Sequence, residues 1–189
     1  MEAFSDGVVA IIITIMVLEL RAPEDVNLAA LQPLVPLFLS YVISFIYVGI
    51  YWNNHHHLLQ ASRHVTGRVL WANLHLLFWL SLFPFCTTWV GETHFASWPV
   101  AVYGCVLLLA GGAYTILTRA LIACHGGDST LAKAVGRDSK GWLSIALYAV
   151  AVPLSFYKAW IAFLVYVLVA AIWLIPDRRI ERTMHDSAK

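Results

Sequence analysis

Charged residues are scarce in this sequence, and that scarcity excludes most soluble folds. Lysine, arginine, aspartate and glutamate make up 12% of the 189 residues, whereas a typical soluble domain carries about 25%. Hydrophobic residues account for 60%, and the mean hydropathy is +0.74. The net charge of +1 carries no information on partners, and we expect no nucleic-acid partner. The composition predicts a membrane protein that contacts the lipid bilayer.

Groups that carry chemistry are also sparse. The three cysteines, Cys86, Cys105 and Cys124, lie in or beside apolar runs without CxxC spacing, so we expect free thiols. The sequence has no HExxH motif, no serine–histidine–aspartate arrangement and no paired carboxylates within an apolar run. We therefore predict that the protein is not an enzyme and that it uses no cofactor.

The amino terminus lacks the features of a cleaved signal peptide. No basic segment precedes the first apolar run, and LELRAPED after it offers no small-residue cleavage site. We expect this run to remain as a membrane helix. No internal repeat or long linker divides the chain, which predicts a single transmembrane domain over residues 1–189.

Six apolar stretches are long enough, or nearly so, to cross a bilayer. Because a helix rises about 1.5 Å per residue, roughly 20 residues cross the hydrocarbon core. We predict an all-α membrane protein with six transmembrane helices per subunit, at about residues 4–20, 33–54, 69–90, 98–124, 142–156 and 159–175. Pro84 and Pro153 mark candidate kinks inside two of them.

Basic residues are distributed unequally between the two sides of this arrangement. One side receives only Arg21 and Lys158. The other side receives the remaining ten: Arg63, Arg68, Arg119, Lys133, Arg137, Lys140, Arg178, Arg179, Arg182 and Lys189. Since basic loops stay in the cytoplasm, both termini are predicted to be cytoplasmic.

The first predicted helix has one sector that is set apart by helical spacing. That sector, about 100° wide, holds Gly7, Ile11, Thr14, Ile15 and Leu18. Asp6 and Glu19 project away from it, so neither acid shares the face. Two interpretations remain open from the residues alone: a pore-lining face, or a helix that is apolar all round and simply buried.

A polar segment, Trp52-Asn53-Asn54-His55-His56-His57, lies at the end of the second predicted helix and runs beyond it. Neighbouring histidines on a helix point about 100° apart, so three in a row do not bind one metal ion. A metal site would need ligands one turn apart or from elsewhere in the chain. We predict no metal site here, and we expect His57 and His64 to be solvated.

Several of these residues carry a family resemblance. Phe4-Ser5-Asp6 opens the first helix, Trp52, His55 and His56 form a Trp-x-x-His-His pattern, and Trp71-x-Asn73 begins a stretch that ends at Pro84-Phe85. Together they resemble the transmembrane protein 175 family of potassium channels, in its bacterial, single-repeat form. The match covers less than half of the chain.

The resemblance implies a pore on the first helix. In the family, apolar residues on this face form the constriction, which carries that role onto Ile11, Ile15 and Leu18, with Thr14 also facing the ion path. An apolar constriction gates by excluding water and conducts only when it is wide enough to be wetted.

The resemblance also implies a structural network around the motif. Its members would be Phe4, Ser5, Asp6, Trp52, His55, His56 and Asn73. On this reading Asp6 accepts a hydrogen bond from a histidine or from Asn73, which holds the pore helix against the second and third helices.

We therefore expect a homotetramer in the bacterial inner (plasma) membrane that conducts potassium ions, or other monovalent cations, passively around its first helix. The sequence has no TVGYG-type filter, so selectivity would arise at the constriction. The alternatives are a small secondary transporter, which would show inverted repeats and broken helices, or a non-conducting membrane scaffold.

The predicted orientation can be tested with single cysteines in a background free of the native ones. In intact cells, Ala96→Cys is expected to react with an impermeant maleimide, whereas Ser139→Cys is expected to react only after permeabilisation, because it lies on the basic side. The reverse labelling pattern would overturn the orientation.

Overall fold

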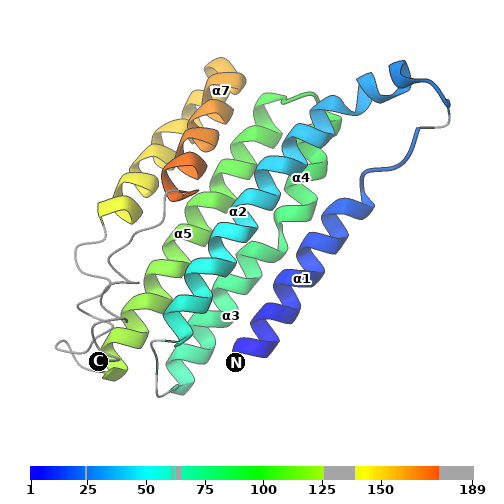
Figure 1. The fold of residues 1–189 in the computed structure, drawn as a ribbon. Helices are drawn as coiled ribbons and strands as arrows, with labels where there is room; N and C mark the ends of the chain where they lie inside the picture. The colour runs from blue at the N-terminus through cyan, green and yellow to red at the C-terminus, as the bar shows by residue number, and fades with distance from the viewer. Residues whose placement is uncertain (24, 61, 63–64, 126–138, 175–189) are drawn as a thin grey trace.

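The chain folds into a bundle of helices (Figure 1). The structure, a computed structural model, describes residues 1–23, 25–60, 62, 65–125 and 139–174. Within these ranges every regular element is helical: α1 (Glu2–Leu18), the 3-10 helix η1 (Leu28–Leu34), α2 (Val35–Gln60), α3 (Gly67–Ser81), α4 (Phe83–Glu92), α5 (Ser97–His125) and α7 (Ser139–Leu174). The all-α prediction is confirmed. Arg63, His64, Lys133, Arg137 and the basic tail lie outside the described residues.

Four helical stretches among the described residues are long and apolar enough to cross a membrane. They are Leu28–Gln60, Gly67–Glu92, Ser97–His125 and Ser139–Leu174. The first helix, α1, has 17 residues and is slightly shorter than the roughly 20 residues that cross a hydrocarbon core. This content confirms a multi-pass membrane protein.

The last stretch, α7, is a hairpin of two arms. Lys158 leaves the helical conformation, with φ −148° and ψ 89°. Trp173 Nε1 donates a hydrogen bond to Ser144 Oγ at 2.8 Å, although a straight helix would separate these residues by roughly 44 Å. Figure 1 shows the yellow and orange arms side by side. The chain reverses at Lys158, between the stretches predicted to end at 156 and begin at 159, rather than at the kink candidate Pro153.

The third predicted helix consists of two pieces, α3 and α4, which meet at Leu82. Pro84 lies in the first turn of α4, where its missing N–H is not needed. The break therefore falls where Pro84 indicates a kink.

Two helices differ from their predicted bounds in ways that affect the site. The first helix covers Glu2–Leu18 instead of 4–20, and α2 continues to Gln60 instead of ending at 54. The three histidines therefore lie inside α2 and not after it. The physical reason is that the polar side chains of this segment form hydrogen bonds within the helix. Asn54 Nδ2 donates to Ile50 O at 2.8 Å, and His56 Nε2 lies 2.8 Å from Gln60 Nε2 one turn later.

The helices form a bundle in which α5 packs against α3, α4 and the α7 hairpin. On the opposite side α1 lies along α2, α3 and α4 (Figure 1). One contact between α5 and α7 depends on a glycine, because a Cβ on Gly104 would collide with the Tyr166 side chain. The Tyr166 ring is fully buried and its hydroxyl donates to Val100 O at 3.3 Å, so it has no room to move.

This contact predicts a position-specific effect of alanine in α5. Gly104→Ala is expected to destabilise the protein by roughly 1–3 kcal/mol, the usual cost of overpacking. Gly112, two turns later on the same helix, has open space where a Cβ would lie, with no neighbouring atom within 4 Å. Gly112→Ala therefore serves as the control and should change stability by less than about 1 kcal/mol. Thermal unfolding in detergent, followed by tryptophan fluorescence, measures both; equal midpoints would contradict the close contact.

Candidate functional site: the outer face of the first helix

Helix α1 has one buried side and one exposed side. Ser5, Val9, Ile12 and Met16 face the bundle, and Ile12 and Met16 expose only 3% and 1% of their surface. These positions follow the i, i+4, i+7, i+11 spacing of one helical face. The orientation of α1 in the protomer is therefore well defined.

The residues predicted to face the ion path all lie on the exposed side. Ile11, Ile15 and Leu18 expose 58%, 42% and 75% of their surface. Thr14 is exposed as well, and its hydroxyl donates to Ile11 O at 2.9 Å. The exposed side is wider than the predicted sector, because Ala10 and Val17 are also exposed. An exposed apolar stripe of this length requires lipid or another protein surface against it.

The interpretation of α1 as apolar all round and simply buried is wrong for the protomer. The helix contacts the bundle through one side only, since α2, α3 and α4 all lie on that side. Hydrophobicity alone gave no sign of this, because both faces are apolar.

A buried chain of hydrogen bonds fastens the first turn of α1. Asn73 of α3 lies between His55 of α2 and Ser5 of α1, with Oδ1 2.6 Å from His55 Nε2 and Nδ2 donating to Ser5 Oγ at 3.0 Å. Ser5 Oγ in turn donates to Met1 O at 3.2 Å. All three side chains are buried. Because Asn73 presents its oxygen to the ring, His55 Nε2 carries the proton and donates it.

Asp6 has a different partner from the expected one. The expectation was a histidine or Asn73, but Trp52 Nε1 donates to Asp6 Oδ1 at 2.9 Å, near the protein surface. Asp6 follows Ser5 in the helix and therefore points about 100° away from the buried chain. Phe4 lies outside this contact and exposes 60% of its surface.

The predicted network thus divides into two groups. One is the buried chain of Ser5, His55 and Asn73; the other is a partly exposed group that joins Asp6 and Trp52 to His56. Glu2, which the sequence analysis missed, joins the second group, with Oε1 3.0 Å from His56 Nδ1. Its position one helical turn before Asp6 was the available signal.

A second buried network, also missed, lies behind α1. Thr87 Oγ1 of α4 is 2.7 Å from Ser44 Oγ of α2 and 3.7 Å from Met16 Sδ of α1. Ser44 Oγ is 2.9 Å from the Tyr103 hydroxyl of α5. Polar residues within apolar helices were the signal, and their pairing links all four helices.

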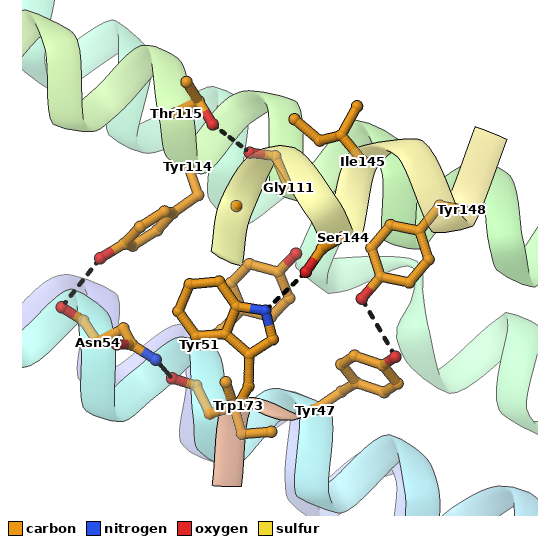
Figure 2. Close-up of a pocket in the computed structure, with 12 residues that line it drawn as sticks. Tyr47, Tyr51, Asn54, Gly111, Tyr114, Thr115, Ser144, Ile145, Tyr148 and Trp173 are labelled. Carbon is orange, nitrogen blue, oxygen red and sulfur yellow. Dashed lines mark hydrogen bonds between the residues drawn. The ribbon is translucent and has the colours of Figure 1, made fainter. Parts of the chain in front are cut away.

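A small cavity of about 40 Å³ lies between α2, α5 and α7 (Figure 2). Figure 2 shows the hydroxyl of Tyr148 donating to that of Tyr47, at 3.1 Å, on one side of the cavity. On another side the Tyr114 hydroxyl donates to Asn54 O at 3.3 Å. No residue of α1 lines the cavity, which has room for about two or three water molecules and is separate from the α1 face.

These features define a multi-pass membrane protein whose first helix presents an apolar face outside the folded protomer. Comparison with known proteins identifies its family. The sequence profile of the family described as endosomal/lysosomal potassium channel TMEM175 matches residues 1–84. A protein named as a potassium channel from Chryseobacterium sp. (strain P1-3) is 56% identical over 187 residues, covering 99% of this chain and 97% of that one.

Two comparisons involve Chamaesiphon minutus. A protein of strain PCC 6605 named as a potassium channel is 30% identical over 176 residues, which cover 85% of each chain. The crystal structure of a lysosomal potassium-selective channel TMEM175 homolog from this organism superposes with a TM-score of 0.79 at 28% identity, covering 92% of this chain and 94% of that one. The chain belongs to the TMEM175 family. The resemblance of the first-helix motif is confirmed, as is the prediction that the protein is not an enzyme.

The buried chain makes a prediction about Asn73. Asn73→Ala is expected to lower the free energy of unfolding by about 1–3 kcal/mol, because it leaves the buried His55 Nε2 without its acceptor and removes the hydrogen bond donated to Ser5 Oγ. Asn53→Ala, at an exposed position of α2, is the matched control and should have little effect. Thermal unfolding in detergent compares them; equal destabilisation by both variants would show that the buried chain does not fasten α1.

Proposed function

We propose that this protein is a potassium-favouring cation channel that conducts passively through a homotetrameric pore lined by α1. One observation carries the proposal: the face of α1 with Ile11, Ile15 and Leu18 is exposed in the protomer while the opposite face is buried. The family and the relatives named as potassium channels supply the class of ion.

Assembly follows from the number of pore helices. Each protomer contributes one α1, and one helix does not enclose a water-filled path. Helix α1 lies at the side of the protomer, so copies related by a symmetry axis would bring their α1 faces together around it (Figure 1). A tetramer in the bacterial inner membrane is the arrangement we propose.

In the membrane we propose six spans with both termini in the cytoplasm. They are α1, η1 with α2, α3 with α4, α5, and the two arms of α7. The start of α1 lies at the same end of the bundle as the start of α3, the end of α5 and the start of α7, while the reversal of α7 lies at the opposite end (Figure 1). Arg68, Arg119 and Lys140 belong to those three helix ends, and Lys158 is the residue of the reversal. Arg119 also lies 6.0 Å from the centre of the Trp142 ring, which joins the ends of α5 and α7 on the basic side.

Ion selection would occur in the apolar part of α1. A ring of isoleucine and leucine side chains holds water poorly, so a cation passes only when the ring widens or when the ion loses hydration. The Thr14 hydroxyl donates its proton to Ile11 O, so the lone pairs of the hydroxyl oxygen remain available. On the side of the ion path this oxygen could accept a hydrogen bond from water or contact a cation. Potassium, which holds its water less strongly than sodium does, would be favoured.

The test is to change the constriction and to compare it with the buried face. Ile11→Asn or Leu18→Ala is expected to raise current and to weaken potassium-over-sodium preference, because a polar or smaller side chain lowers the barrier. A reduction of about 1.4 kcal/mol would raise the current about tenfold. Planar-bilayer recording with potassium and sodium on opposite sides measures both quantities.

Ile12→Val and Met16→Leu are the matched controls, because both residues face the bundle. They should alter stability and leave ion preference unchanged. Preference that changes in the controls but not in the other two variants would mean that the pore face is assigned wrongly. No current from any form, with solute uptake coupled to an ion gradient, would favour a transporter.

A further inference from the structure

Three side chains of types that commonly bind metal ions meet at the beginning of α1. Glu2 and Asp6 lie one turn apart on α1, and His56 lies on α2. One ligand atom from each of the three lies within 4.8 Å of the other two. The three consecutive histidines gave no reason to expect a metal site by themselves, because their side chains diverge. The fold brings two carboxylates to one of them.

The electrostatics of this cluster favour a cation. Two carboxylates one helical turn apart repel each other. Among the described residues, no lysine or arginine nitrogen lies within 4.0 Å of either carboxylate, and the His56 ring forms an ion-pair contact with Glu2. One imidazole, even when protonated, carries a single positive charge and does not balance two carboxylates. A divalent cation would balance both.

The imidazole nitrogen that faces the acids is shielded from solvent. His56 Nδ1 lies 3.0 Å from Glu2 Oε1, but no regular hydrogen bond is aligned between them, and within the described part of the chain Nδ1 has no other partner. A buried nitrogen of this kind requires either a proton shared with a carboxylate or a metal ion.

Surrounding residues hold the ligands in place. The Gln60 side-chain amide lies 2.8 Å from His56 Nε2, the ring nitrogen on the far side from the acids. The His56 ring stacks on Trp52 with 5.7 Å between ring centres and 23° between planes. Trp52 Nε1 also donates to Asp6 Oδ1, which leaves Oδ2 for a metal. Bonds of this kind to the outer side of each ligand are characteristic of metal sites.

We propose that Glu2, Asp6 and His56 bind a divalent transition-metal ion of the zinc class. One imidazole and two carboxylates suit zinc, whereas calcium and magnesium prefer oxygen ligands alone. Each ligand atom lies about 2.0–2.2 Å from a bound zinc ion, so ligand atoms are about 3–4 Å apart. Small rotations of the exposed Glu2 and the partly exposed Asp6 side chains would close the remaining difference.

A metal here would act on the pore helix. Its ligands come from α1 and α2, so the ion would clamp the first turn of α1 to its neighbour. If α1 moves relative to α2 when the constriction widens, the clamp reduces current. This consequence rests on the proposed channel function, whereas the metal site itself does not.

Zinc binding to the purified full-length protein tests the site. The protein should carry no polyhistidine tag, and isothermal titration with zinc chloride should show one site per chain. Glu2→Gln and His56→Gln are each expected to weaken binding by at least about 10–100-fold, the range observed for the loss of outer partners alone. His57→Gln is the control and should bind as the unchanged protein does.

The site is refuted if zinc shows no saturable binding, if His56→Gln binds normally, or if His57→Gln loses binding equally. Unfolding midpoints without zinc show which variants are folded. Glu2→Gln keeps the test valid if His56→Gln is unstable, because Glu2 is exposed in the first turn of α1 and glutamine keeps the size of its side chain.

Potassium flux into proteoliposomes, with and without zinc, tests the consequence. Zinc should slow flux through the unchanged protein and through His57→Gln, but not through Glu2→Gln. Stoichiometric binding without any flux would refute the channel and leave the site supported. Flux without zinc binding would refute the site and leave the channel supported.

Discussion

The attachment of the first turn of α1 to α2 and α3 is the constraint on which the proposed pore depends. Asn73 holds His55 and Ser5 at once, and all three are buried where water does not replace a lost bond. Turning Ser5 inward sets the rotation of the whole helix. Positions 9, 12 and 16 then face the bundle, and positions 11, 14 and 18 face outward.

The rest of the protomer supports that attachment. The Thr87 and Ser44 hydroxyls connect α4 and α2 directly behind Met16, and Ser44 reaches α5 through Tyr103. Close packing at Gly104 brings the α7 hairpin against α5. The protomer is thus a support on one side of α1, and the outer side of α1 remains for contacts with lipid or with other copies.

The two polar groups at the start of α1 have different physical character, although they share one helical turn. Ser5 belongs to a fully buried chain of hydrogen bonds between neutral groups, and this chain sets the position of α1. Asp6 and Glu2 belong to a partly exposed cluster with excess negative charge beside His56, which is suited to a cation. Neighbouring residues on a helix diverge by about 100°, and that divergence separates the buried hydrogen-bond chain of Ser5 from the proposed metal site of Glu2 and Asp6.

The sequence by itself determined the class of protein, the helical content, the break near Pro84 and the motif that identifies the family. These follow from composition, apolar length and local chemistry, which are readable along the chain. It also selected the exposed side of α1 through Ile11 and Leu18, although only by resemblance. Only the tertiary structure decided that Trp52 rather than a histidine bonds to Asp6 and that His56 meets Glu2. Those outcomes depend on how two helices lie against each other, and side-chain partners on separate helices leave no periodic signal in either one.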